Sequence, residues 1–434
     1  MFWFRSSGCK KIMKDYIKKT KIFTIYKKIR AQYYYYKYSI LGSRLIFNIS
    51  YHYYLLINSF ENNLFYNYKK NILHKINLNN IKSVIIVYSK MHFDPKNDHS
   101  EQPFYYTGTA SVTRQIWNLF EGKERFYIDI KTRKLDNIPK VDIIIGLMSP
   151  HFRICAKANP GAKKILLLVN CHPLYRAKVL LEESKSLHRH LPGTEWVSPK
   201  LFFSTRKYAD SIALTGNQVI KDTYLDYGVK EIPIRFLNTG INTDRIIPNP
   251  ELRPKDKIRF IYPASHKAIR KGLFRMLDAW KKLNLLVPKE SIELYLVGGD
   301  EPSFIDEINF FTKEYPNVFN FPWVSNDVQL KYFQSSHVVV APAIEEGQVT
   351  TVLEVMACGA VPIITPQCGI NLAHGIEGFI INDYKNTDEI ANYMKRLVNN
   401  KTILASMSIQ AIINIKRNNN WEDFRKNLTK IIEE

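Results

Sequence analysis

The chain has 434 residues, of which 45% are hydrophobic and 13% aromatic, so a wholly disordered protein is excluded and two or three folded domains are expected. Its net charge is +22 at pH 7, and its five cysteines are scattered without a CxxC pair, which excludes a disulfide framework or a zinc cluster and favours a reducing compartment. No run approaches the roughly 18 apolar residues that span a bilayer, and the start has no signal-peptide pattern, so we expect a cytoplasmic protein.

The first 80 residues carry much of the charge excess, with 15 Lys or Arg against two acidic residues. We assign 1–80 to a basic, aromatic N-terminal extension with a helical start, because Lys11, Lys14 and Lys18 share one side of a would-be helix. Three interpretations stay open: peripheral binding to the anionic cytoplasmic face of a membrane, a helical extension with a solvated basic face, and binding of nucleic acid. Nucleic acid is the least expected partner because no recognised nucleic-acid module accompanies the charge.

From residue 82 onwards, short β-branched runs alternate with longer amphipathic stretches, a pattern typical of parallel α/β units. The first such domain is predicted over 81–245. In it, a glycine turn at Gly108 opens a helix whose Val112, Ile116 and Leu119 share one face. The predicted strands of this domain are Val84–Tyr88, Val141–Gly146, Ile165–Val169 and Ser211–Thr215.

A segment rich in proline and charge, 242–257, is predicted to link this domain to a second α/β domain over 246–418. The final segment, 419–434, contains one amphipathic helix that begins near Trp421. The predicted strands of the second domain are Ile258–Tyr262, Glu293–Val297, Val338–Ala341 and Val361–Thr365.

The most informative stretch is 337–369, which predicts a strand, a loop, a helix with a glycine stop, and another strand. Glu346 lies in the loop, Thr350 and Thr351 fall in the first helical turn, and Glu354 follows one turn later. The unpaired N–H groups and the positive dipole end of such a helix favour a diphosphate. A carboxylate on the same face can accept hydrogen bonds from ribose hydroxyls. The alternative is that Glu346 and Glu354 are merely solvated loop and helix-surface residues.

With this motif, residues 82–434 resemble glycosyltransferase family four, whose members are retaining enzymes of the GT-B fold, with two Rossmann-like domains facing a cleft. The resemblance implies that Glu346 contacts the hydroxyls of the donor sugar and that Glu354 holds the ribose of the nucleotide. It also implies that the backbone between them cradles the sugar and the diphosphate, and that the last helix crosses back to the N-terminal domain. The donor-binding residues implied within this backbone are Gly347, Gln348, Thr350 and Thr351.

Other segments follow in the order that the family has. Residues 212–229 and 234–248 resemble the family's interdomain passage, and 261–280 resembles the segment in which a Lys-Gly pair opens a helix. In that segment the resemblance implies that Lys271 grips the donor phosphates. The alternative is that Lys271 is a solvated lysine at a helix start.

Three further contacts with the donor are expected. His172 comes just after a predicted strand, where family members carry a histidine that faces the donor sugar and the β-phosphate, although a lone histidine is often structural. The turn at Gly108 and Thr109 matches the family's glycine loop near the diphosphate and the acceptor. Contacts with the base are expected from Trp323 and Val324, which follow a short strand.

The sequence departs from the family pattern at two positions. Ser265 stands where the family usually has an arginine six residues before the phosphate lysine, and Val349 stands where it has a glycine three residues after the first glutamate. The phosphate grip and the fit of the sugar are therefore expected to differ. Arg270 or His266 could replace the missing cation, and Gln348 could add a polar contact to the sugar.

These observations predict a hexosyltransferase-type enzyme that moves a sugar from a nucleoside-diphosphate sugar to an acceptor hydroxyl with retention of configuration. Catalysis is assigned to His172, Lys271 and Glu346, with no cofactor, no metal and no covalent nucleophile. The acceptor is expected to be a glycan or glycolipid of a cell-surface polysaccharide pathway. Two alternatives stay open: a non-catalytic, membrane-bound homologue that acts as a scaffold, and a protein that binds nucleic acid through 1–80.

Overall fold

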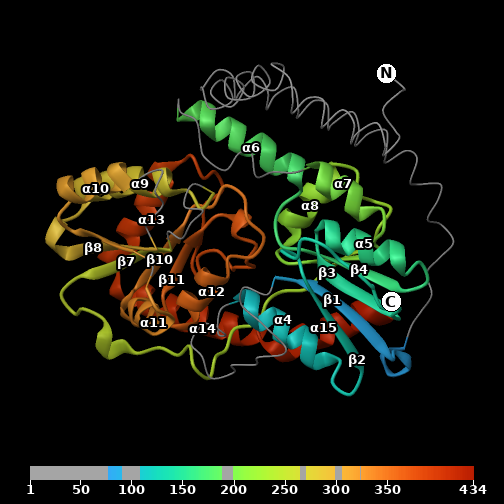
Figure 1. Ribbon diagram of the computed structural model, residues 1–434. Helices are drawn as coiled ribbons and strands as arrows, with labels where there is room; N and C mark the ends of the chain where they lie inside the picture. The colour runs from blue at the N-terminus through green and yellow to red at the C-terminus, as the bar shows by residue number, and fades with distance from the viewer. Residues whose placement is uncertain (1–76, 90–107, 188–198, 264–269, 299–304, 323) are drawn as a thin grey trace, which may run out of the picture.

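The structure is a computed structural model that describes residues 77–89, 108–187, 199–263, 270–298, 305–322 and 324–434. These residues form two α/β domains that stand side by side, each built on a parallel sheet of six strands (Figure 1). The predicted N-terminal extension lies outside the described residues, apart from its last four. Within the described part, no helix is both long enough and apolar enough to cross a membrane.

The N-terminal domain has the strand order β2-β1-β3-β4-β5-β6. Its central strands are runs of Val, Ile and Leu that are buried on both faces, as expected where helices cover a parallel sheet from both sides. The elements are β1 (Ser83–Tyr88), α4 (Gly108–Leu119), β2 (Glu124–Asp129), β3 (Ile143–Leu147), α5 (Pro150–Ala158), β4 (Lys163–Leu168), α6 (Pro173–Ser186), α7 (Pro199–Arg206), β5 (Ser211–Leu214), α8 (Gln218–Asp226) and β6 (Ile234–Phe236).

The C-terminal domain has the strand order β12-β11-β10-β7-β8-β9. Its strands all pair in parallel, so their carboxyl ends lie along one edge of the sheet. The elements are β7 (Ile258–Pro263), α9 (Leu273–Leu286), β8 (Ile292–Val297), α10 (Ile305–Glu314), β9 (Val318–Phe321), α11 (Asn326–Ser335), β10 (Val338–Ala341), α12 (Thr350–Ala357), β11 (Val361–Ile364), β12 (Phe379–Ile380), α13 (Thr387–Asn399) and α14 (Lys401–Asn418).

The last helix, α15 (Trp421–Glu433), lies against the N-terminal domain, next to α4 in Figure 1. Its apolar face buries Phe424 and Leu428 in one cluster with Val84 and Ile86 of β1. The Lys163 ammonium also donates to a backbone carbonyl near the end of α15, at 2.5 Å. The described part of the chain therefore begins and ends on the same domain.

The eight strands predicted from the sequence are confirmed, with ends that differ by one or two residues. The edge strands β2, β6 and β12 were not predicted. The side chains of β2 are half-exposed almost throughout, and β12 has two residues, so neither has the buried apolar run that identifies an inner strand.

Candidate functional site

The loop that leaves β10 meets the loop that leaves β4, so the carboxyl ends of the two sheets contact each other between the domains. The Cys171 thiol donates to the carbonyl of Glu346 at 3.0 Å. A Cβ atom on Gly347 would lie 2.1 Å from the carbonyl oxygen of Val169. Only glycine allows this approach of the two backbones, which brings the predicted donor loop directly against the N-terminal domain.

The turn that carries Arg270 and Lys271 docks on the same loop. The N–H of Ile344 donates to the carbonyl of Arg270 at 2.7 Å. Gly272 has φ +80°, and a Cβ atom there would lie 2.0 Å from the carbonyl oxygen of Pro342. Because the left-handed backbone and the close contact both require glycine, the Lys-Gly pair fixes the start of α9 beside the end of β10.

Helix α12 begins with Thr350, and no side chain caps its first turn, because the preceding residue is Val349. One turn later Glu354 is half-buried, and burial raises the pKa of its carboxyl to about 8, against an opposing effect of the nearby Lys271 ammonium. Lys271 itself is 8% exposed. The structure thus brings Lys271, Glu354 and the start of α12 to one place.

Glu354 also opens on a pocket between α11, α12 and the interdomain segment. Ile246 and Asn326 are among the residues that line it. Val324, predicted to contact the base, is half-buried two residues before Asn326, while Trp323 lies outside the described residues. Glu354 therefore borders a small cavity, of about 40 Å³, on the side that faces α11.

Sequence reasoning missed Glu345, whose side chain is fully buried. Its carboxylate pairs with the guanidinium of Arg270 and accepts from Arg176 Nε on α6 at 2.9 Å. Arg270 also donates to Asn170 Oδ1 at 2.8 Å and lies 3.3 Å from Glu346 Oε2. Arg270 is thus held by two carboxylates. To replace the family's phosphate arginine, as predicted, Arg270 would have to leave one of them.

His172 lies away from this cluster of charges, in an aromatic core. Its ring stacks on Tyr227 at 4.8 Å between centroids and meets Phe202 edge-on at 4.9 Å. Its Nδ1 accepts from the N–H of Leu174, so it caps α6, and its side chain has no exposed surface. Burial, and then the charge of Arg206, hold the pKa of His172 well below its usual value. This packing favours the structural interpretation, and the donor contact stays a prediction without support from the geometry.

The remaining predicted residues are placed as follows. Gln348 accepts from the N–H of Thr239 at 2.8 Å, so its amide oxygen is engaged by the interdomain passage instead of facing an open site. Gly108 and Thr109 form the first turn of α4, and the preceding residues lie outside the described part. Ser265 and His266 also lie outside it, so the effect of the missing arginine and its replacement by His266 both stay predictions.

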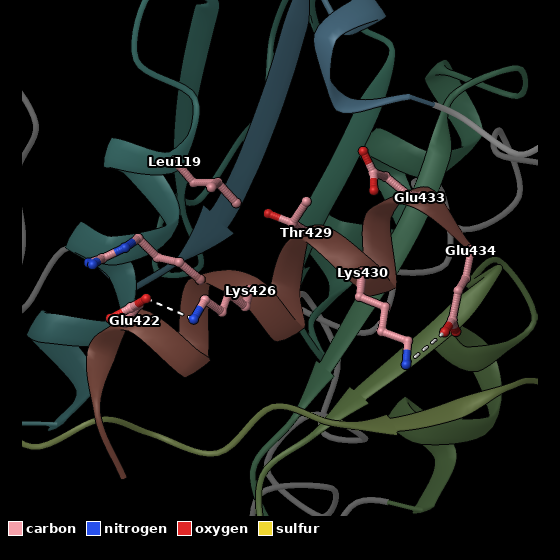
Figure 2. Close-up of a pocket in the computed structure, with 8 residues that line it drawn as sticks. Leu119, Glu422, Lys426, Thr429, Lys430, Glu433 and Glu434 are labelled. Atoms are coloured by element: carbon pink, nitrogen blue, oxygen red, sulfur yellow. Dashed lines mark ion pairs between the residues drawn. The ribbon is translucent and has the colours of Figure 1, made fainter. Parts of the chain in front are cut away.

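A surface hollow lies on α15 beside Leu119, and none of the predicted donor residues is among those that line it (Figure 2). Lys426 pairs with Glu422 at 2.7 Å, and Lys430 lies 4.0 Å from Glu434. Because its cations are compensated along the helix, this hollow is a solvated helix face and offers no excess charge to a diphosphate.

Among the described residues, no group of three or more His, Cys, Asp or Glu side chains is arranged to hold a metal ion. The expected absence of a metal stays a prediction.

Comparisons with known proteins agree with this architecture. The model of a family described as glycosyl transferases group 1 matches residues 257–400. An uncharacterized glycosyltransferase of Haemophilus influenzae is 27% identical over 172 residues, which cover 37% of this chain and 47% of that protein. The chain thus spans about half the length of the curated relative it matches.

Among solved structures, sucrose-phosphate synthase from Thermosynechococcus elongatus aligns with a TM-score of 0.60 and 16% identity, over 80% of this chain and 98% of that chain. WaaG, a glycosyltransferase involved in lipopolysaccharide biosynthesis, aligns with a TM-score of 0.53 and 14% identity, over 81% and 99%. The chain has the GT-B fold. The two Rossmann-like domains predicted from the sequence are therefore confirmed, and the loop and helix at 342–357 lie within the part matched by the family model.

Proposed function

We propose that this protein is a retaining glycosyltransferase of family four that moves a hexosyl group from a nucleoside-diphosphate sugar to an acceptor hydroxyl. The observation that carries the proposal is the meeting of Lys271, Glu354 and the uncapped start of α12 at the interdomain edge of the C-terminal sheet. A cation, backbone N–H donors and a carboxylate are what a pyrophosphate joined to a ribose requires. The match to group 1 glycosyltransferases over 257–400 supports the same activity.

The charges on the two walls fit a diphosphate. Arg176 and Arg270 pair with Glu345, and Arg270 also lies beside Glu346, while Glu354, with a pKa of about 8, is largely protonated at pH 7 and adds little negative charge next to Lys271. A cation about 4 Å from a phosphate contributes roughly 4 kcal/mol at an effective dielectric of 20, before the cost of desolvation. Because negative charge accumulates on the leaving diphosphate, Lys271 and the α12 start stabilise the transition state most.

Glu346 is assigned the orientation of the donor sugar. Its carboxylate is half-buried, at the contact between the domains, and one oxygen is held by Arg270. The second oxygen can then accept from a sugar hydroxyl without a change in the position of the carboxylate. We assign no covalent nucleophile and no metal, and the close contact of the loops would exclude water that would otherwise hydrolyse the donor.

Binding of nucleoside diphosphates tests the site. UDP, GDP, ADP and CDP are compared by thermal shift with the corresponding monophosphates, and a preferred diphosphate should raise the melting temperature most. Donor hydrolysis or transfer by the intact chain, lost in Glu346→Ala while diphosphate binding persists, would support the enzyme. An intact chain that binds no nucleoside diphosphate and turns over no donor would contradict it and favour a non-catalytic scaffold.

We further propose that the acceptor is a glycan or glycolipid of the cell surface, and that 1–80 hold the protein peripherally on an anionic cytoplasmic membrane face. The support is the basic, aromatic composition of 1–80. Flotation with vesicles that contain phosphatidylglycerol, compared for the intact chain and a chain that starts at residue 77, tests this. Salt-sensitive binding of oligonucleotides without flotation would favour a nucleic-acid partner instead.

A further inference from the structure

A group of charged side chains outside the sequence motif joins the two domains beside Glu346. Glu345 is fully buried and follows β10 in the C-terminal domain, whereas Arg176 stands in the first turn of α6 in the N-terminal domain. The Arg176 Nε donates to Glu345 Oε2 at 2.9 Å, and both side chains are almost inaccessible, at 12% and 0% exposure. Glu345 therefore has its full set of partners only when the domains are in contact.

Arg270 connects this buried pair to Glu346. Its Nε pairs with one oxygen of Glu345, and one terminal nitrogen donates to the other oxygen at 3.2 Å. The same terminal nitrogen lies 3.3 Å from Glu346 Oε2. Because a guanidinium is planar and rigid, a carboxylate that binds one edge of it also fixes the direction of its other nitrogen atoms.

A buried carboxylate that loses its partner is strongly unfavourable, so Glu345 favours the arrangement in which Arg176 and Arg270 both reach it. Asn170, which follows β4, adds a third hold on Arg270 from the N-terminal domain at 2.8 Å. Contact between the domains and the orientation of Arg270 are thus parts of one arrangement.

We propose that Glu345 is a positioning residue of the donor site: together with Arg176 it orients Arg270, and through Arg270 it sets the Glu346 carboxylate when the domains close. The proposal rests on the proposed glycosyltransferase function for its effect on turnover, but its structural part does not depend on the donor. In this proposal Arg270 aligns Glu346 and does not keep a permanent contact with phosphate.

The chain offers a matched control in a second ion pair between the same two domains. Arg275 of α9 donates to Glu183 of α6 at 3.0 and 2.8 Å, and Glu183 is 1% exposed. Arg275 belongs to the first turn of α9, and Glu183 belongs to the last turn of α6, at the end of that helix opposite to Arg176. The pair has the same chemistry and similar burial. Arg275 contacts Glu183, Ser186 and the ring of Tyr384, and it contacts neither Arg270 nor Glu346.

The test compares the full chain with Glu345→Gln, Arg176→Gln, Arg176→Lys and the control Arg275→Gln. Arg176→Gln leaves Glu345 paired with Arg270, so it keeps the test valid even where Glu345→Gln does not fold. The first readout needs no ligand: it is amide hydrogen exchange over 344–349. We expect exchange to rise at least ten-fold in Arg176→Gln and Glu345→Gln, less in Arg176→Lys, and to stay within two-fold of the wild type in Arg275→Gln.

The second readout is hydrolysis of UDP-glucose and GDP-mannose. A positioning role predicts that Arg176→Gln lowers kcat at least ten-fold per folded molecule with a smaller change in KM, and that Arg176→Lys restores part of it, while Arg275→Gln keeps kcat within two-fold. Unchanged exchange over 344–349 and unchanged kcat in Arg176→Gln, or equal effects in Arg275→Gln, would overturn the positioning role. A wild type that binds none of UDP, GDP, ADP and CDP refutes the proposed function instead, and the exchange result then decides the structural part alone.

Discussion

Replacing Glu354 with glutamine should remove a pH-dependent destabilisation of the folded protein. Burial raises the pKa of Glu354 from 4.5 to about 8, and Lys271 reduces the rise without cancelling it. At about 1.4 kcal/mol per pKa unit, ionisation is roughly 4–5 kcal/mol harder in the folded protein than in the unfolded chain. Because the side chain is half-buried and partly screened by solvent, we expect about 2–3 kcal/mol of this to be measurable.

The sign follows from proton binding. Between pH 4.5 and 8 the folded state holds a proton on Glu354 that the unfolded state has already released, so the free energy of unfolding falls as pH rises through this interval. Glutamine does not titrate. Relative to the wild type, Glu354→Gln should therefore gain about 2–3 kcal/mol of stability between pH 5 and pH 9.

Urea unfolding of both proteins at pH 5, 7 and 9 gives this difference, and all other titrating groups cancel in the comparison. Nucleotide binding provides a second measurement, because ribose hydroxyls donate to the ionised form. UDP or GDP should bind the wild type more tightly as pH rises towards 9, and Glu354→Gln should bind roughly 10- to 100-fold more weakly there. Nucleotides that lack both ribose hydroxyls should not distinguish the two proteins. Parallel stability curves over pH 5–9 would refute the reasoning.

Three other changes test separate parts of the structure. Lys271→Gln should raise the pKa of Glu354 above about 8 and weaken binding of the preferred nucleoside diphosphate roughly ten-fold or more, as measured by titration calorimetry; unchanged affinity would remove Lys271 from the phosphate site. Gly347→Ala should separate the domains, since the new methyl group would collide with the backbone after β4, and small-angle scattering should show a larger radius of gyration with both domains still folded. Phe424→Ala, at a side chain that is 1% exposed, should destabilise the N-terminal domain by about 3–5 kcal/mol in urea unfolding, whereas an effect confined to the C-terminal domain would contradict the packing of α15.

The parts of the site that the sequence predicted are those whose pattern is local. The strand β10, the uncapped start of α12 and the carboxylate one turn later follow one another within 20 residues, so periodicity and spacing identify them. The Lys-Gly pair that ends in Gly272 was expected at a helix start because 261–280 resembles the family segment in which such a pair opens a helix. The structure adds the physical reason for this glycine, which is the contact with the carbonyl of Pro342.

The rest depends on contacts between residues far apart in the sequence. Arg176 and Glu345 are separated by 169 positions, and a single charged residue on α6 or in a loop gives no signal that it will be buried against the other domain. For His172, its place after a strand suggested a donor contact, which stays a prediction, but the sequence gave no sign of the aromatic rings that enclose it, because they come from α7 and from the residue that ends α8. The local pattern predicts where a strand ends, whereas the direction of the next side chain depends on packing.

The two carboxylates that the motif identifies are each controlled by a residue outside the Glu346 and Glu354 pair. Burial raises the pKa of Glu354, and the charge of Lys271 sets how easily the proton leaves. Glu346 lies next to Arg270, whose direction depends on Glu345 and therefore on the contact between the domains. A diphosphate that binds Lys271 and a ribose that favours ionised Glu354 both act on the pair of Lys271 and Glu354. Domain closure acts on Glu346 through Glu345 and Arg270. Donor binding and alignment of the sugar can thus be altered separately by mutation, although Glu346 and Glu354 are only eight positions apart.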